Sequence, residues 1–295
     1  MIEIYLLQQL VGISEYSTLS EAAEHLHITQ PTLTRSIRKL EELLGVELFR
    51  REKNRIYIND AGRLAVEYAK GILASEDEMI AVIQALDRSR HTISVASCAP
   101  APNVMLKQQL EGQYPHMRIT GEIRPEQELL DGLKRGEFQL IILSDAIKES
   151  GLCCKKIGTE HLRLSVLPAH PAAMMDSVSF SDIDHGSFLV YKNLGVWEDI
   201  GRELMPNTHF IAQDGMDEYL EVVGSSSLPT FDTDWGTILY GERTNRVSIP
   251  IKDSAAQRTF YAVYKDSERK RFDELIERVR ERYQATADKT PPEIL

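Results

Sequence analysis

Polar and basic side chains that could contact a nucleic acid gather in one short stretch of the chain. They are Gln30, Thr32, Thr34, Arg35, Arg38 and Lys39. In the major groove of DNA an arginine can read guanine and a glutamine can read adenine, while hydroxyl and ammonium groups hold phosphates. This combination of residue types predicts contact with double-stranded DNA.

The charge distribution points to the same stretch. Residues 27–58 hold seven basic and four acidic side chains, a local net charge of +3, whereas the whole chain carries −11 and the remainder therefore −14. A basic island on an acidic body is typical of a protein that meets a polyanion with one face. On charge alone, a solvated helix face is an equally good interpretation.

Two short helices are predicted to position these side chains. The first runs from residue 18 to about Leu26, because Thr18-Leu19-Ser20-Glu21 has the spacing of a capping box. The second starts at Thr29 or Gln30, has a proline in its first turn, and ends at Gly45.

The second helix has a predicted inner and outer face. Its apolar residues follow a helical period and form one stripe that should face a core: Leu33, Ile37, Leu40 and Leu44. Arg35 and Arg38 fall on the opposite side. Two helices joined by about three residues, the second exposing Gln, Thr and Arg, have the geometry of a helix-turn-helix. We add Thr18, at the start of the first helix, to the candidate DNA contacts.

A small wing is predicted directly after these helices. Residues Phe49–Ile58 read as two short strands around a basic turn that contains an asparagine. Arg51, Lys53 and Arg55 lie at its tip, where they could follow the phosphate backbone or enter the minor groove.

The first 65 or so residues resemble the winged helix-turn-helix of LysR-type transcriptional regulators. The resemblance rests on "LSEAAEHLHITQPTLTRSIRKLEELLGVELFRR" followed by "INDAG", in register throughout. Given this resemblance, a helical hairpin that serves only for packing is a poor interpretation of these residues. It also implies a linker helix that pairs two subunits and, further along the chain, a periplasmic-binding-protein-like (type 2) effector domain of two lobes that binds small inducers between them.

One long helix is predicted from Asp60 to about Arg88, a stretch without proline. Apolar and small residues alternate in three- and four-residue steps and form a seam of the coiled-coil type: Ala65, Tyr68, Ile72, Ser75, Met79, Val82 and Leu86. The seam either pairs with a second subunit, as the resemblance implies, or packs on this chain's own core. A dimer would present two recognition helices to a two-fold site.

Alternating strands and helices are predicted beyond a boundary at residues 89–91, in the βαβ order of a mainly parallel sheet. The predicted strands are Thr92–Ala96, Arg118–Ile123, Gln139–Leu143, His161–Leu167, Phe188–Tyr191, His209–Ala212, Thr237–Leu239, Val247–Pro250 and Thr259–Tyr264. The predicted helices are Val104–Tyr114, Glu126–Arg135, Trp197–Leu204, Met216–Val223 and Glu268–Tyr283. The fold class is therefore α/β with an all-α winged helix-turn-helix at the N-terminus.

The domain limits follow from these elements and from the resemblance. We expect a DNA-binding domain at 1–59, a dimerisation helix at 60–90 and an effector domain at 91–295. Lobe 1 would hold 91–160 and 265–295, and lobe 2 would hold 161–264. Crossover strands near His161–Leu164 and Ala262–Lys265 would join them.

Ligands of open α/β sheets bind beyond the carboxyl ends of the strands, so the loops that follow strands supply the candidate effector contacts. These are Ser97, Cys98, Arg124, Glu126, Tyr191 and Ser226. Two departures from the family pattern bear on them. The usual Gly-x-Gly-Ile-x-x-x-Pro turn reads Gly224-Ser225-Ser226-Ser227-Leu228-Pro229, and the first-strand loop holds Cys98. A surface arginine at Arg124 and a plain polar loop at 225–227 are alternative interpretations.

Other classes of protein lack their defining devices here. The eight histidines are scattered and no Walker A, G-x-S-x-G or G-x-G-x-x-G motif is present, so we expect no enzyme, no metal and no cofactor. Three cysteines, two of them adjacent, exclude a disulfide scaffold and suit a reducing cytosol. Cys153 and Cys154 precede two lysines, which leaves a redox role open beside that of inert thiols. No apolar run is long enough to span a membrane.

The resulting hypothesis is a cytoplasmic, ligand-responsive transcription factor. It would bind an inverted-repeat operator as a homodimer or homotetramer and respond to a small molecule of unknown identity, with RNA polymerase as a further candidate partner. The rival hypothesis is a solute-binding protein whose N-terminal helices only dimerise.

Overall fold

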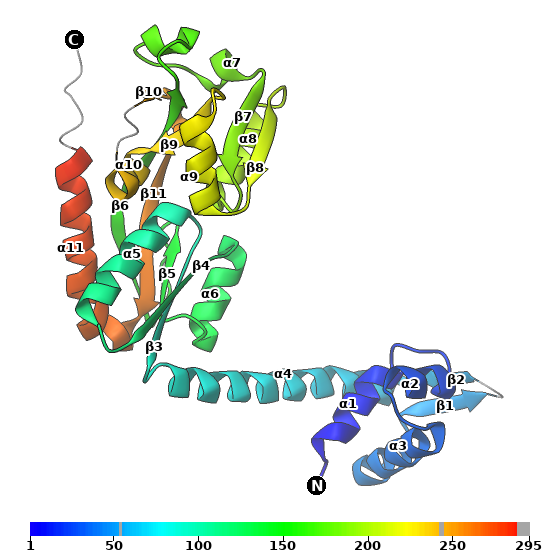
Figure 1. The fold of residues 1–295 in the computed structure, drawn as a ribbon. Coiled ribbons are helices and arrows are strands. Elements are labelled where there is room, and N and C mark those ends of the chain that lie inside the picture. Colours follow the sequence, from blue (N-terminus) through cyan, green and yellow to red (C-terminus); the bar gives the residue numbers. More distant parts are fainter. Residues whose placement is uncertain (53–54, 242–244, 288–295) are drawn as a thin grey trace. The chain divides into compact units, whose positions relative to one another are not determined.

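The computed structural model describes residues 1–52, 55–241 and 245–287, and side chains there except those of residues 51, 52, 55, 199, 202 and 283–287. The chain divides into two compact units, residues 1–84 and 85–295 (Figure 1). The finer predicted limits at residues 59 and 90, and those of the two lobes, stay predictions.

The first unit opens with three helices, α1 (Ile4–Ile13), α2 (Leu19–His25) and α3 (Gln30–Leu44). The Thr18 hydroxyl accepts a hydrogen bond from the Glu21 amide at the start of α2, and Thr29 does the same for Thr32 at the start of α3. Gly45 ends α3 in the left-handed conformation, at φ 71°. Both predicted helices are confirmed; Thr29 rather than Gln30 caps the second, and only the Thr18 half of the predicted capping box is formed at the first.

The core of the first unit is apolar and is built on α3. Leu33, Ile37 and Leu40 are buried as predicted, whereas Leu44 is 40% exposed, so its place in the core was wrong. Helix α1 was not predicted, although Leu6, Leu7, Leu10 and Ile13 repeat at helical spacing and are all buried.

The predicted wing is a two-stranded antiparallel sheet of β1 (Phe49–Glu52) and β2 (Arg55–Ile58), with Phe49 opposite Ile58. Gly62 lies against its base. A Cβ atom at this glycine would come within 2.2 Å of the Leu48 carbonyl oxygen, so only glycine fits. The wing is thereby held close to the helix that follows it.

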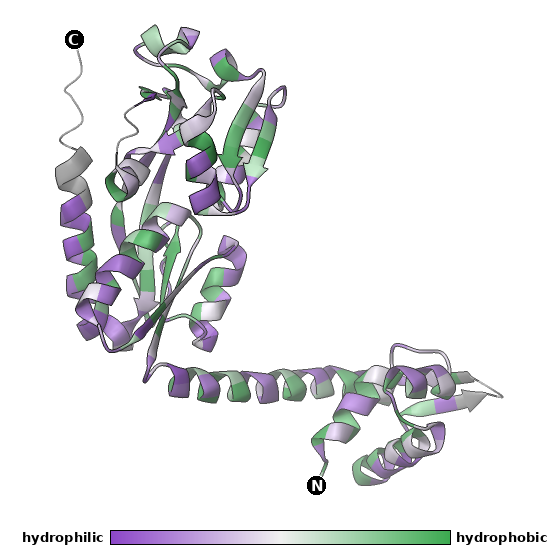
Figure 2. Ribbon diagram, in the orientation of Figure 1, coloured by the Kyte–Doolittle hydropathy of each residue, from purple (hydrophilic) through white to green (hydrophobic). Residues whose placement is uncertain are grey.

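Helix α4 (Asp60–Arg88) has the predicted limits. Most of its predicted seam is open to solvent in this chain: Tyr68, Ile72, Met79, Val82 and Leu86 are 45–68% exposed. Apolar and polar residues alternate along it (Figure 2). Packing of the whole seam on this chain's own core is therefore wrong. No helix in the described residues is long and apolar enough to cross a membrane.

The second unit is built on one curled, mixed sheet with strand order β4-β3-β5-β11-β6-β9-β7-β8, and β10 pairs with β6. The strands are β3 (Thr92–Ser97), β4 (Arg118–Ile123), β5 (Leu140–Leu143), β6 (Leu152–Val166), β7 (Ser187–Tyr191), β8 (His209–Gln213), β9 (Thr230–Thr233), β10 (Val247–Pro250) and β11 (Gln257–Lys265). Strands β3, β4 and β5 pair in parallel, as do β7, β8 and β9, whereas β6 and β11 are antiparallel neighbours. The two long strands β6 and β11 thus cross between two lobes, as the resemblance implied.

Helices cover this sheet (Figure 1). They are α5 (Pro100–Gln113), α6 (Glu126–Arg135), α7 (Phe180–Ile183), α8 (Val196–Leu204), α9 (Met216–Ser225), α10 (Asp234–Tyr240) and α11 (Arg269–Ala287), with 3-10 turns at Pro171–Met174, Ser254–Ala256 and Asp266–Glu268. The strand predicted at Thr237–Leu239 was wrong, because this segment lies in α10. The Thr233 hydroxyl caps α10 by accepting from the Gly236 amide, and this cap outweighs the β-branched residues that suggested a strand.

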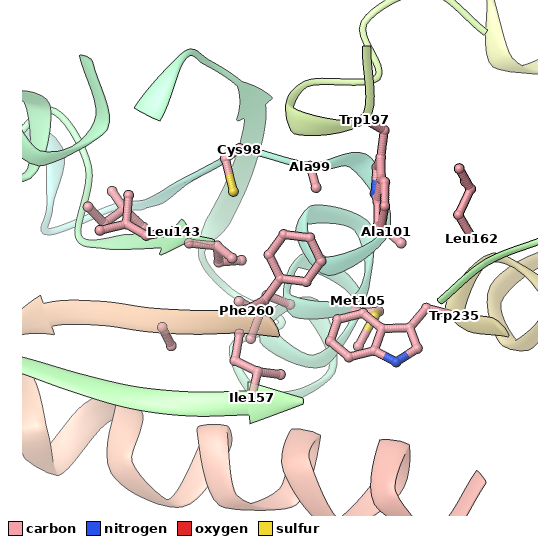
Figure 3. Packing of buried hydrophobic residues seen from close by; sticks show 14 of the residues in the cluster. Cys98, Ala99, Ala101, Met105, Leu143, Ile157, Leu162, Trp197, Trp235 and Phe260 are labelled. Atoms are coloured by element: carbon pink, nitrogen blue, oxygen red, sulfur yellow. The ribbon is translucent and has the colours of Figure 1, made fainter. Parts of the chain in front are cut away.

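The core of the second unit runs through both lobes. Trp235 of α10 packs on Phe260 of β11, with ring centroids 5.7 Å apart, and Met105 of α5 lies beside them (Figure 3). A main-chain hydrogen bond of 2.9 Å, from the Val196 amide to the Cys98 carbonyl oxygen, links the start of α8 to the loop after β3. A Cβ atom at the preceding Gly195, whose φ is +60°, would lie 1.9 Å from that oxygen, so glycine is required here.

Candidate functional site

The outer face of α3 is the first candidate site. Arg35 and Arg38 are exposed there, opposite the buried stripe that holds the helix on α1 and α2. Neither side chain makes a hydrogen bond or an ion pair with any other described residue. Two guanidinium groups are therefore presented to solvent from the first turns of a rigid helix.

The remaining candidates on this face are in part already engaged. Gln30 is exposed and its amide oxygen accepts from the Ser20 hydroxyl at 3.4 Å, while Thr32 bonds to Thr29. Thr34 is half-buried. The Lys39 ammonium donates to the Glu3 carboxylate at 2.9 Å and raises its own pKa by doing so. The Glu3 carboxylate thus partly compensates the charge of Lys39.

The tip of the wing is only partly described. Arg51 and Arg55 lie in β1 and β2, but their side chains, and the whole of Lys53, are outside the described residues. Arg50, which was not among the candidates, places its guanidinium 5.9 Å from the ring centre of Tyr57. The predicted role of the tip stays a prediction.

The second candidate site is a cavity of about 380 Å³ in the second unit. Most of its wall comes from β7, β8, β9, α8, α9 and α10, and lobe 1 adds the start of α5 at Pro100 and Ala101. The volume falls in the range of small-molecule sites. The wall is mainly apolar and aromatic.

One carboxyl group lies in this wall without access to solvent. Glu160 of β6 is 1% exposed, accepts a hydrogen bond of 3.2 Å from Trp197 Nε1, and also bonds to the Thr233 side chain. Burial raises the pKa of Glu160 to about 7, and the nearby Asp234 carboxylate adds to this effect. Near neutral pH this carboxyl exists in both charge states.

Other polar groups around the cavity are paired. Lys192 forms an ion pair of 2.7 Å with Asp214. The Ser248 hydroxyl donates to Asp232 at 2.9 Å. Next to Glu160, the Nδ1 atom of His161 lies 2.7 Å from Asp234, whose carboxylate raises the pKa of this histidine. Ion pairs and hydrogen bonds therefore fix the positions of these polar side chains.

Of the six predicted effector contacts, Tyr191 lines this cavity and the other five do not. Ser97 is buried and bonds to the backbone of Ala99, and the buried Cys98 thiol lies beside Glu126, whose carboxylate accepts from the Ser144 amide. Arg124 is exposed and pairs with Glu122 at 3.0 Å. The Ser226 hydroxyl accepts from the Leu228 amide. The effector roles of all six stay predictions.

Two family models match successive parts of the chain. The "Bacterial regulatory helix-turn-helix protein, lysR family" matches residues 4–63, and the "LysR substrate binding domain" matches residues 89–215. The chain belongs to the LysR family of transcriptional regulators. The resemblance in the first residues is confirmed, and this LysR-family chain is a DNA-binding regulator with an effector-binding domain, not an enzyme.

Individual relatives agree with this assignment. The chain is 30% identical over 170 residues to the "Uncharacterized HTH-type transcriptional regulator YcgK" of Bacillus subtilis, a match that spans 56% of this chain and 52% of that protein. It is 25% identical over 301 residues to the "DNA-binding transcriptional dual regulator OxyR" of Escherichia coli, covering 96% of both. A full-length OxyR structure from Pseudomonas aeruginosa has the same fold, with a TM-score of 0.50 and 21% identity over 95% of this chain and 100% of that one.

Two cysteines of this LysR-family chain are held as thiols. Burial raises the pKa of Cys98 well above its usual range. Burial and a hydrogen bond from the thiol to Asp266 raise the pKa of Cys153 to about 11, so the lysines that follow it do not activate it. Cys154, the next residue of β6, is half-buried.

Sequence reasoning missed the polar centre of the cavity, Glu160, Trp197 and Thr233. Candidates were sought in loops after strands, whereas Glu160 lies within the crossover strand β6. Because the same strand also holds Lys155, Lys156 and Arg163, the sequence offered no signal that singled out Glu160.

Proposed function

We propose that this LysR-family regulator reads a specific DNA sequence with α3. The observation that carries the proposal is the pair of exposed arginines, Arg35 and Arg38, without partners in the described residues on the outer face of a capped helix. A helix of this kind enters the major groove, where Arg35 and Gln30 would contact base edges. The DNA phosphates, which fix the position of the protein along the duplex, would be contacted by Arg38, Lys39, Thr18, Thr32 and Thr34. Arg51, Lys53 and Arg55 would follow the backbone beside it.

The protein would act as a homodimer or homotetramer on an inverted repeat. Support comes from the exposed apolar seam of α4, since a surface of this kind is stable when a second copy covers it. We expect Ile72→Glu to shift the protein from dimer to monomer, because it places a charge in the seam. Sedimentation velocity measures this, with Lys70→Glu on the same helix as the matched control. An unchanged dimer would mean that the subunits associate elsewhere.

The effector would bind in the cavity of the second unit. A ligand that prefers one arrangement of the lobes can shift the balance of arrangements only by its differential affinity for them. Such a shift would change how the paired DNA-binding units meet the operator and RNA polymerase. The site of action would be the cytoplasm.

Fluorescence anisotropy tests the DNA-binding proposal. The full chain is titrated onto a duplex from its own upstream region and onto a scrambled duplex, each at two salt concentrations. We expect tighter binding to the native duplex, and binding to both that weakens with salt. Equal, weak binding to both duplexes would instead favour a solute-binding protein whose N-terminal unit only dimerises.

A further inference from the structure

Several aromatic side chains line the cavity. Those that face it include Tyr191, Trp197, Phe210, Tyr219, Phe231 and Tyr240. The Tyr191 and Tyr219 rings lie 6.0 Å apart at an angle of 53°, so they form a corner rather than a flat stack. The faces of such rings carry negative potential and attract cations, most strongly where water is excluded.

The charged groups of the wall, like its aromatic rings, favour a cationic ligand. Glu160, Glu198 and Asp232 contribute carboxylates, against one described basic residue, Lys192. The Asp214 carboxylate, 2.7 Å from the Lys192 ammonium, compensates that positive charge. The described part of the wall thus favours a positive ligand over a negative one.

Glu160 is the most buried of these groups and forms no ion pair with any described residue, although the neighbouring His161 acts to lower its pKa. Its two described hydrogen-bond partners, the Trp197 indole and the Thr233 hydroxyl, are neutral. Arg258 lies opposite Glu160 in the β6–β11 ladder, yet no ion pair joins them. A buried carboxylate without a counter-ion is unfavourable, and a cation placed beside it relieves that penalty.

We propose that the cavity binds a small organic cation, an ammonium group carried on an aromatic or apolar body, with the Glu160 carboxylate as its counter-ion. The rings of Tyr191, Tyr219 and Phe231 would surround the apolar body. This inference rests on the proposed function only in taking the cavity as the effector site. It adds the chemical class of the effector.

Isothermal titration calorimetry of the full-length chain with three probes of nearly equal shape tests this. The probes are 2-phenylethylammonium, 2-phenylethanol and 3-phenylpropanoate. We expect the ammonium to bind about tenfold or more tightly than the alcohol, the scale of one hydrogen bond to a charged group, and the carboxylate to bind least. Glu160→Gln keeps the shape of the wall and should remove the preference for the ammonium while leaving the affinity for the alcohol.

Glu149→Gln is the matched control, since Glu149 is an exposed partner of Lys134 and does not line the cavity, and should behave as wild type. The proposal is overturned if ammonium and alcohol bind equally, if Glu160→Gln keeps the preference, if the carboxylate binds best, or if no probe binds up to its solubility limit. The same samples are titrated onto the native and scrambled duplexes. If the protein discriminates between the duplexes but shows no preference for the ammonium, this inference alone is refuted. If it prefers the ammonium but does not discriminate between the duplexes, the DNA-reading proposal alone is refuted.

Discussion

An Arg35→Ala variant is expected to fold normally and to lose most of the preference for the native duplex over the scrambled one. Arg35 is exposed on α3 and has no partner in the described residues, so its removal leaves no buried group unpaired. A bidentate contact to guanine is worth about 1–3 kcal/mol of discrimination, so the affinity for the native duplex should fall about tenfold or more. Anisotropy on both duplexes measures this.

The control for Arg35 removes the same charge from another surface. Arg118→Ala takes an exposed arginine from β4 in the second unit and should leave both affinities unchanged. If Arg35→Ala weakens binding to the two duplexes by the same factor, Arg35 contacts phosphate rather than a base. If it changes neither affinity, α3 does not lie against the DNA with this face.

The second unit should lose stability as the pH rises from 5 to 8, and Glu160→Gln should remove most of this loss. The folded state raises the pKa of Glu160 from 4.5 to about 7, so it binds the proton more tightly than the unfolded chain does. The resulting stabilisation is complete below pH 4.5 and disappears as the pH rises through 7. A shift of this size corresponds to about 3 kcal/mol at most.

Urea unfolding followed by tryptophan fluorescence reports on this unit, because both tryptophans, Trp197 and Trp235, lie in it. Glu160→Gln should match wild type near pH 5 and be more stable at pH 8. His161 acts in the same direction, since Asp234 raises its pKa, and this contribution should persist in the variant. A wild-type protein that gains stability up to pH 8, or a variant that is less stable there, would contradict the expectation.

The elements that were predicted correctly are those whose limits are set by residues close to them in the sequence. Helix α3 could be delimited because Thr29 and Gly45 cap it locally, and the limits of α4 follow from an unbroken stretch. The prediction of a strand at Thr237–Leu239 was wrong because it counted β-branched residues and did not consider the Thr233 side chain, which caps a helix there.

The cavity could not be predicted for a different reason. Glu160, Trp197 and Thr233 come from β6, α8 and β9, and only strand pairing across many intervening residues brings them together. Reading loops after strands found Tyr191 because that rule applies within one βα unit. It has no means of finding a group on a strand that runs through both lobes.

The hydrogen bond between Val196 and Cys98 bears on how the ligand specificity of such a regulator can change by mutation. This joint between the lobes consists of main-chain atoms and one glycine, Gly195, and no side chain takes part in it. The cavity, by contrast, is lined mainly by residues with apolar and aromatic side chains. This hydrogen bond therefore does not depend on the side chains that line the cavity, and those side chains can be exchanged by mutation or by design while the bond stays as it is.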